Sequence, residues 1–391
     1  MVNLSKEEQK MFDGEVGEAA RQSMEILVAM GKIYDAEKMI PVSSAQVSGV
    51  SYKTIGDAGL EYLQDLVRKG AKTRVPTFLN PAGMDEAQWK EMGVPGDFAE
   101  KQLEILDAYS KMGIMKTCTC APYFIGIRPR EGEHVAWAES SAVSFANSVL
   151  GARTNREGGP SALAAAVCGV TPAYGLHLDE NRKANIVVDV QCELKTAADF
   201  GALGSAIGKL AKRKYPAFRG IKSATEEQLK VLGASMAATG SVPIYFVENI
   251  TPEYNIADDA GQMTFTDFQL RSSKDELDSG EKPQLVTIGC PHASLEEIRE
   301  IAEMVQEKKP TTEFWVCTAR KLKDEAGRLG YTEKIEKAGG KVVADTCMVV
   351  CPLERMGYHV TGTNSGKAAK YLPSLCSQKV AFGKLKDILY R

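Results

Sequence analysis

The sequence has few histidines, little net charge and no long apolar segment, and each of these shortages removes a class of protein. It contains four histidines in 391 residues and has a formal net charge of −3. A charge so close to zero offers no basic surface that would attract nucleic acid or an anionic membrane. No apolar run is long enough to span a bilayer, and the charged segment 1–14 shows no signal-peptide pattern. The sequence therefore predicts a cytoplasmic protein without a nucleic-acid or membrane partner.

A Cys-x-x-Cys pair, the usual sign of a structural zinc site, is also missing from a chain with nine cysteines. The number is odd and the spacing is wide, which argues against a disulfide framework in a reducing compartment. Burial, catalysis and metal binding remain as roles for these thiols.

Helix-like and strand-like segments alternate along most of the chain. Residues 17–34 repeat apolar side chains at helical spacing, whereas 284–290 and 312–319 are short apolar runs typical of buried strands. Repeated βα units of this kind predict a multi-domain α/β fold with mostly parallel sheets flanked by helices. Segment 252–283 is polar, and we expect it to be loop-rich and to contain a possible boundary between subdomains.

Three strand-like runs end in cysteine, namely 115–120 (MKTCTC), 284–290 (QLVTIGC) and 341–347 (KVVADTC). In open α/β folds, ligands gather outside the carboxyl ends of the strands, so Cys120, Cys290 and Cys347 are candidates to meet at one point. In an extended strand, Cys118 would lie on the same face as Cys120. The alternative for all of them is simple burial, since free cysteine often packs as a small hydrophobe.

The residues alone do not decide which metal these cysteines would bind. Zinc is possible, because Cys118 with Cys120 and Cys347 with Cys351 are near-pairs of other spacings. Three thiolates from separate strands also suit an iron–sulfur cluster with one open iron, which is a Lewis acid able to hold a substrate oxygen.

Four motifs together resemble the aconitase X family of the aconitase superfamily, over nearly the whole chain. They are TCTCAPY, AESSAVSFANSVLGARTNREGGPSAL, GCPHAS and ADTCMVV. The resemblance implies an aconitase-like catalytic region over 1–391 that lacks the swivelling domain. It also implies dehydration of (R)-5-phosphomevalonate to trans-anhydromevalonate 5-phosphate, in a modified mevalonate pathway for isoprenoid biosynthesis.

The resemblance further implies a [4Fe-4S] cluster held by Cys120, Cys290 and Cys347, with Cys118 and Cys351 as competing neighbours. In two-subunit members of the family, the swivelling domain and its catalytic serine lie on a separate small protein. We therefore expect a heterodimer with a small subunit, and a chain that is inactive alone.

Several further residues are candidates for contact with an anionic substrate or for proton transfer. Glu139 and Ser140 are predicted to be catalytic, the carboxylate being able to transfer a proton if burial raises its pKa; Glu139 alternatively favours a helix N-terminus. The predicted substrate contacts lie in turns that enter helices or follow strands, where backbone N–H groups attract anions. They are Gly49, Val50, Ser51, Asn80, Pro81, Ser140, Ser141, Arg153, Arg156, Gly366 and Lys367.

Each of these candidates has a plainer interpretation. The turns at 48–51 and 80–81 are equally well explained as ordinary capped turns, and the two arginines as a loop salt-bridged to Glu157. Residues 361–368 (TGTNSGKA) look like a phosphate-binding P-loop but lack its first glycine and its Ser or Thr. Lys367 would then be a solvated lysine.

Two other functions compete with the leading one. The nearer is dehydration of cis-3-hydroxy-L-proline, which is also catalysed within aconitase X. A rival of another class is a non-catalytic protein that binds zinc or senses redox state through its thiols.

Overall fold

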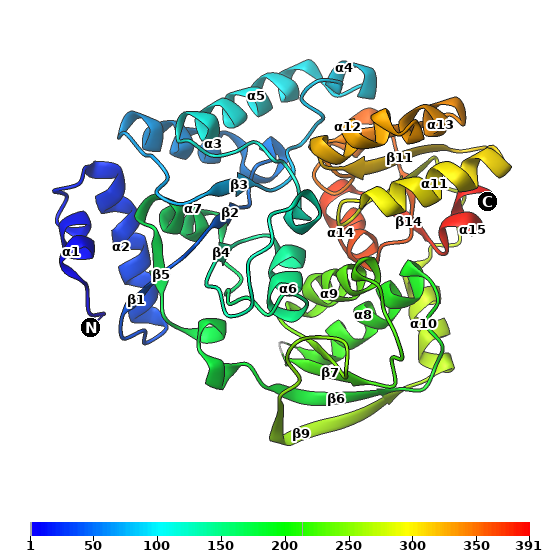
Figure 1. Cartoon of the computed structure of the whole chain (residues 1–391). Helices are drawn as coiled ribbons and strands as arrows, with labels where there is room; N and C mark the ends of the chain where they lie inside the picture. Colours follow the sequence, from blue (N-terminus) through cyan, green and yellow to red (C-terminus); the bar gives the residue numbers. More distant parts are fainter. Residues whose placement is uncertain (1, 213) are drawn as a thin grey trace.

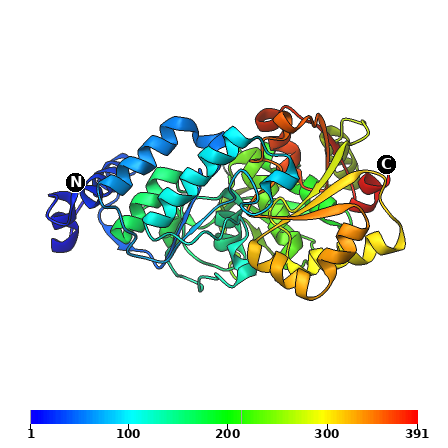
Figure 2. The same cartoon turned by 90° about the horizontal axis from the view of Figure 1, so that it is seen from above.

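The computed structural model describes residues 2–212 and 214–391 and has three α/β lobes (Figures 1 and 2). Parallel sheets dominate, since the one antiparallel pairing in the described part of the chain is between β1 and β5. The helices are α1 (Lys6–Phe12), α2 (Glu18–Ile33), α3 (Tyr52–Arg68), α4 (Trp89–Met92), α5 (Gly96–Lys111), α6 (Ser140–Ser148), α7 (Gly159–Cys168), α8 (Ala197–Ala211), α9 (Glu226–Gly240), α10 (Asp267–Leu277), α11 (Leu295–Glu307), α12 (Arg320–Arg328), α13 (Tyr331–Lys337), α14 (Gly366–Cys376) and α15 (Leu385–Leu389). The strands are β1 (Met39–Pro41), β2 (Ala45–Val47), β3 (Thr77–Leu79), β4 (Ala136–Trp137), β5 (Val170–Pro172), β6 (Ala184–Val190), β7 (Pro216–Arg219), β8 (Phe246–Val247), β9 (Ile256–Phe265), β10 (Leu285–Ile288), β11 (Glu313–Thr318), β12 (Gly340–Ala344), β13 (Val360–Thr363) and β14 (Lys379–Phe382).

The first lobe comprises α1–α7 and β1–β5, and is built on a parallel sheet with the strand order β3-β2-β4. One apolar core joins α3, α5 and α7 to this sheet, through residues such as Leu63, Ile105, Leu163 and Val47. These side chains recur at helical or strand spacing, which is why the amphipathic pattern places them on the inner face.

The second lobe comprises β6–β9 and α8–α10, with the parallel strand order β8-β7-β6-β9. The prediction that 252–283 is loop-rich is wrong, because this segment contains the ten-residue strand β9 and helix α10. Strand β9 is a partly exposed edge strand of the sheet, and that position accounts for its polar sequence. The subdomain boundary inside 252–283 stays a prediction.

The third lobe comprises β10–β14 and α11–α15, and its five strands are all parallel in the order β12-β11-β10-β13-β14. Alternate residues of β10 face opposite sides, so that Val286 and Ile288 pack against α11–α13. Leu285 instead faces a core that also includes Leu372 of α14 and Leu203 of α8. Helix α14 therefore lies between the second and third lobes, and the predicted α/β class with mostly parallel sheets is confirmed.

The segment 115–120 is not a strand, which corrects the predicted geometry of its two cysteines. Met115 makes one isolated bridge to Phe78, and the backbone then leaves the extended conformation. Cys118 has a φ of 43°, in the left-handed region. The two sulfur atoms therefore do not share a strand face, and Cys118 packs in the core of the first lobe.

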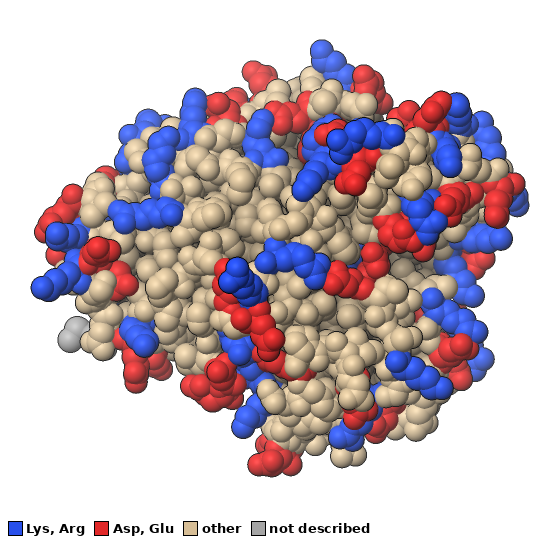
Figure 3. Space-filling model, in the orientation of Figure 1, with Lys and Arg blue, Asp and Glu red and all other residues tan. Residues whose placement is uncertain are grey.

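None of the described helices has the length and apolar character that crossing a membrane requires. On the face shown in Figure 3, basic and acidic side chains are interspersed over the surface.

Asp85 ties the first lobe to the third through a buried ionic contact. Its carboxylate is 2.5 Å from Nη2 of Arg320 and 3.1 Å from Nζ of Lys323, and it accepts a hydrogen bond from the backbone N–H of Ala344. Burial by itself would raise the pKa of Asp85, but the two cations and the backbone N–H hold it below its ordinary value. The carboxylate is therefore ionised in the folded protein.

We expect Asp85→Asn to destabilise the chain by about 3 kcal/mol, because it removes the carboxylate partner of Lys323 and leaves Arg320 with only Asp345. Since the folded-state pKa is lowered, this stabilisation is complete above the unfolded-state pKa and is lost as the pH falls through the folded-state value. Urea unfolding midpoints at neutral and acidic pH measure both effects. Asp97→Asn, which removes an exposed ion pair with Arg355, is the matched control and should barely move the midpoint. If the difference in urea midpoint between Asp85→Asn and the parent chain is as large in acid as at neutral pH, this prediction is wrong.

Candidate active site

The carboxyl ends of two parallel sheets, one in the first lobe and one in the third, face each other at the centre of the molecule. The segment after β3 meets the segment after β12, where the N–H of Ala82 donates to the carbonyl of Asp345 at 2.8 Å. Ala82 and Thr346 also form an isolated parallel bridge. Crevices outside the carboxyl ends of parallel strands are the usual ligand sites of α/β folds, and this junction joins two of them.

The three predicted ligand cysteines come together at this junction. The exposed fractions of Cys120, Cys290 and Cys347 are 4%, 5% and 7%. Interaction with the thiol of Cys290 lowers the pKa of Cys347 to about 7, against the opposing effect of burial. Burial raises the pKa of Cys120, and the nearby charge of Glu139 raises it further.

The two competing cysteines have other surroundings. Cys118 lies in the core formed by α3, α5 and α7. Cys351 is 3.7 Å from the sulfur of Met356, and burial raises its pKa above the ordinary thiol range. These positions favour the choice of Cys120 and Cys347 as the ligands, which stays a prediction.

The donor set at the junction fits a soft metal centre in its chemistry. Among the described residues, no three His, Cys, Asp or Glu side chains are already spread around a point as metal ligands. The three thiols nevertheless influence one another's pKa values, and the pKa of Cys347 is lowered to about 7. Buried thiolates of this kind are typical ligands of iron–sulfur clusters.

Glu139 and Lys367 form a buried ion pair beside the thiols. Glu139 is the N-cap of α6, where it accepts hydrogen bonds from the backbone N–H groups of Ser141 and Ala142, each at 2.8 Å. Lys367, in the first turn of α14, donates to the Glu139 carboxylate and lies 3.3 Å from Oγ of Ser141. The two helices approach each other through their N-terminal ends, which places two partial positive charges next to the pair.

Glu139 was predicted to transfer a proton on the condition that burial raises its pKa. In the structure, its pKa is lowered instead. Burial would raise its pKa, but the positive charge of Lys367 and the bonds from Lys367, Ser141 and Ala142 outweigh it, so that the pKa is lowered. Lys367 stays protonated, because the opposing charge of Glu139 overcomes the effect of burial and raises its pKa. Glu139 is therefore a carboxylate that can accept a proton. It is not a protonated acid waiting to donate one.

The predicted anion-binding turn at 49–51 contacts the third lobe. Gly49 has a φ of 78°, and its carbonyl accepts from the hydroxyl of Tyr109. Oγ of Ser51 caps α3 and donates to the carbonyl of Val350 at 2.9 Å, so the turn adjoins the loop that follows Cys347. Val50 is buried, and its carbonyl accepts from Gln102.

Three buried oxygen atoms near the meeting sheet ends have no hydrogen-bond partner among the described residues. They are Oδ1 of Asn80, Oε1 of Gln46 and Oγ1 of Thr346. Asn80 and Pro81 follow β3, and Gln46 lies on the neighbouring strand and donates to the carbonyl of Thr119. Gln46 and Thr346 were missed by the sequence reasoning, although a glutamine inside a buried strand is a signal that could have been noticed.

Arg153 and Arg156 lie in contacts of their own. Arg153 pairs with Glu253 at 2.5 Å and with Asp179 at 2.8 Å. Arg156 is exposed and donates to the carbonyl of Ala237 at 3.4 Å. The structure does not pair either arginine with Glu157, whose carboxylate accepts from Ser161 and Thr171. Their contact with substrate stays a prediction.

Gly366 begins α14 where it crosses α8. A Cβ atom at this position would lie 2.6 Å from the carbonyl oxygen of Gly201, so only glycine allows the two helices to approach this closely. This packing sets the position of Lys367 next to it.

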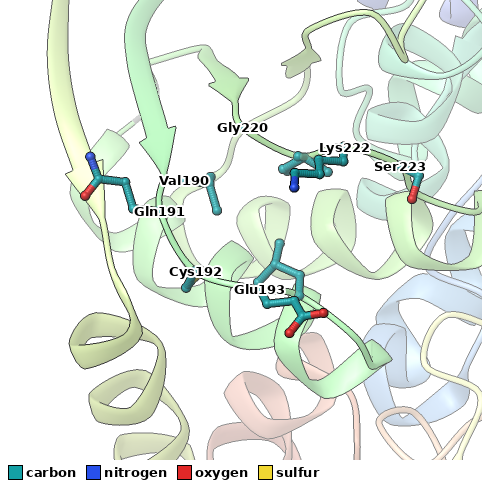
Figure 4. Close-up of a pocket in the computed structure, with 9 residues that line it drawn as sticks. Val190, Gln191, Cys192, Glu193, Gly220, Lys222 and Ser223 are labelled. Atoms are coloured by element: carbon teal, nitrogen blue, oxygen red, sulfur yellow. The ribbon is translucent and has the colours of Figure 1, made fainter.

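A cavity of about 540 Å³ lies at the ends of β6 and β7 in the second lobe, and Figure 4 shows its lining. Cys192, Glu193 and Lys222 are among the residues around it. Its lining contains none of the predicted site residues.

Comparisons with known proteins agree on one family. The models described as aconitase X first, second and third domain match residues 1–180, 184–277 and 283–391. The crystal structure of Thermococcus kodakaraensis aconitase X (holo-form) is 48% identical, with a TM-score of 0.94 and coverage of 99% of each chain.

Three named relatives show how the chain stands within this family. Proteins named phosphomevalonate dehydratase large subunit are 55% identical in Methanothermobacter thermautotrophicus, over 99% of this chain and 98% of that one, and 50% identical in Methanocaldococcus jannaschii, over 99% of both. A cis-3-hydroxy-L-proline dehydratase of Pseudomonas aeruginosa is 34% identical over 97% of this chain, which spans 68% of that protein.

Proposed function

The chain belongs to the aconitase X family, and from this premise we infer that it is the large subunit of a phosphomevalonate dehydratase, a hydro-lyase. The observation that carries this inference is the identity of 47–55% with four archaeal large subunits, over at least 95% of the length of each. The hydroxyproline dehydratases are more distant, at 31–34%, and this chain spans only about two thirds of their length. The reaction would remove water from (R)-5-phosphomevalonate to give trans-anhydromevalonate 5-phosphate, on the modified mevalonate pathway to isoprenoids.

The substrate carries a carboxylate and a phosphate, and the junction contains groups suited to anions. The Lys367 ammonium and the N-terminal ends of α6 and α14 provide positive charge in a buried site, where it acts more strongly than in water. Ser140 and Ser141 add hydroxyl groups, and the 49–51 turn adds backbone N–H groups. The proposed substrate contacts are these residues with Asn80, Pro81 and Gly366. Arg153 and Arg156 are also proposed contacts, and they would have to leave their present partners to bind the substrate.

Glu139 is the proposed proton acceptor. The dehydration removes a proton from the carbon next to the carboxylate, and an ionised, buried carboxylate is the group for this step. Its pKa is held low by Lys367 in the free chain. Lys367 would turn toward the substrate anion, and Glu139 would lose part of that stabilisation and become a stronger base.

The proposed cofactor is a [4Fe-4S] cluster held by Cys120, Cys290 and Cys347. A cluster with an open iron supplies Lewis acidity, which assists departure of the substrate hydroxyl. The lowered pKa of Cys347 and the burial of all three thiols support this assignment.

The proposed partner is a small subunit carrying the swivelling domain, in a heterodimer that works in the cytoplasm. The name "large subunit" of the archaeal relatives supports a small one. All nine cysteines are free thiols, as a reducing compartment maintains them.

The test is anaerobic purification of the chain, analysis for iron and acid-labile sulfide, and assay with a candidate small subunit. We expect both elements to be present, and phosphomevalonate to be dehydrated only when the two subunits are combined. Turnover of cis-3-hydroxy-L-proline in its place would favour the other aconitase X activity. Zinc without sulfide would refute the cluster.

A further inference from the structure

His292 contacts all three cysteine-bearing segments at once. It lies two residues after Cys290, and its backbone N–H donates to the sulfur of Cys120 at 3.2 Å. Its ring atom Nδ1 is 3.0 Å from Oγ1 of Thr119, the residue before Cys120. Its other ring atom, Nε2, is 2.9 Å from the carbonyl oxygen of Thr346, the residue before Cys347.

The partners of the ring determine its tautomer. A carbonyl oxygen only accepts hydrogen bonds, so Nε2 carries the proton and donates to Thr346. Nδ1 is then the acceptor for the hydroxyl of Thr119, whose oxygen in turn accepts from the N–H of Ala121. Both ring nitrogens are therefore used by the protein, which leaves neither for a metal or a substrate.

The backbone of His292 is fixed from a third direction by Lys230 of α9. Nζ of Lys230 is 3.1 Å from the carbonyl oxygen of His292 and 2.5 Å from the carboxylate of Glu297. Only 1% of Lys230 and 1% of His292 are exposed. The residue thus lies where the first lobe, the second lobe and the third lobe meet.

We propose that His292 is a positioning residue that holds the Cys120 and Cys347 segments against the Cys290 segment before any cofactor is bound. The inference rests on the proposed function in one respect, that these three thiols are the ligands of the cluster. Hydrogen bonds behind the ligands commonly set both their orientation and the affinity of the metal.

The first test uses the full chain without cofactor and cobalt(II) as the probe, since thiolate-bound cobalt absorbs strongly. His292→Leu removes both ring bonds, and His177→Leu is the matched control. His177 is a histidine with 4% exposure whose hydrogen bond to His134 lies apart from the thiols. We expect His292→Leu to weaken cobalt binding by about 10- to 100-fold and the control to leave it unchanged.

A second pair of variants separates the two ring bonds. His292→Gln places its amide nitrogen near Nε2 and can still donate to Thr346, whereas His292→Asn places its amide near Nδ1 and can still meet Thr119. We expect cobalt affinities between those of the parent and His292→Leu for both. After reconstitution with iron and sulfide, each variant should also lose iron to a chelator faster than the parent, and its reduced cluster should give a shifted paramagnetic resonance spectrum.

The outcomes distinguish this inference from the function on which it rests. Unchanged cobalt affinity in His292→Leu, or an equal loss in His177→Leu, would overturn the positioning role. If His292→Leu does not fold, parental cobalt affinity in both the Gln and Asn variants would overturn it instead. A parent chain that takes up neither cobalt nor iron and sulfide would contradict the ligand assignment, and the inference would fall with it.

Discussion

Cys347→Ser should give a folded chain that contains no iron–sulfur cluster and shows no dehydratase activity with the small subunit. Serine has nearly the shape of cysteine, so packing at this buried position is preserved. Its hydroxyl, however, stays protonated near neutral pH, whereas the Cys347 thiol has a pKa of about 7 in the folded protein. The change therefore removes the most readily ionised of the three proposed soft ligands.

The measurement is iron and sulfide content after anaerobic reconstitution, followed by turnover of phosphomevalonate. Cys118→Ser is the matched control, because Cys118 is also buried and lies two positions from Cys120, but packs in the core of the first lobe. It should retain the cluster and most of the activity. Full cluster content in Cys347→Ser, or its loss in Cys118→Ser, would show that the ligands are assigned wrongly.

Lys367→Met should abolish turnover and destabilise the chain by about 3–5 kcal/mol, because Glu139 is left as an unpaired buried carboxylate. The loss of stability alone would not establish a role in binding. The double variant Lys367→Met with Glu139→Gln removes both charges and should recover most of the stability while staying inactive. Urea midpoints, cluster content and kcat/KM together separate the two effects.

Lys274→Met is the control for the second prediction. Lys274 pairs with the buried carboxylate of Asp199 in the second lobe, so its removal should also destabilise the chain. It should leave kcat/KM close to that of the parent wherever the protein is folded. Activity in Lys367→Met similar to that of Lys274→Met would remove Lys367 from the substrate site.

The sequence predicted the α/β class because short apolar runs alternate with amphipathic helices, and this pattern depends on local periodicity. Segment 115–120 was misread as a strand for the same reason, since its alternating thiols and hydroxyls mimic a period of two. The backbone at Cys118 instead takes a left-handed conformation, and Thr119 turns to bond with His292. Strand β9 was missed because an edge strand needs fewer apolar residues than a central one.

The candidate site could be assembled only in part from the sequence. Strand ends followed by cysteine indicated where three thiols would gather, and family resemblance indicated Glu139 and Lys367. The contacts that hold these groups together could not be read from the chain. His292 bonds to Thr119 across 173 positions and Arg320 reaches Asp85 across 235, and no local pattern records such tertiary partners.

The pairing of Glu139 with Lys367 across 228 residues has a consequence for how the protein is made. At ribosomal rates of 5–20 residues per second, roughly 11 to 46 seconds separate the emergence of the two side chains. During this interval Cys120 has left the ribosome while the segment bearing Cys347 is still unfinished, so a nascent chain offers only an incomplete set of thiols. Assembly of the proposed cluster would therefore follow synthesis of the Cys347 segment, and truncated products that end before it should retain neither iron nor sulfide.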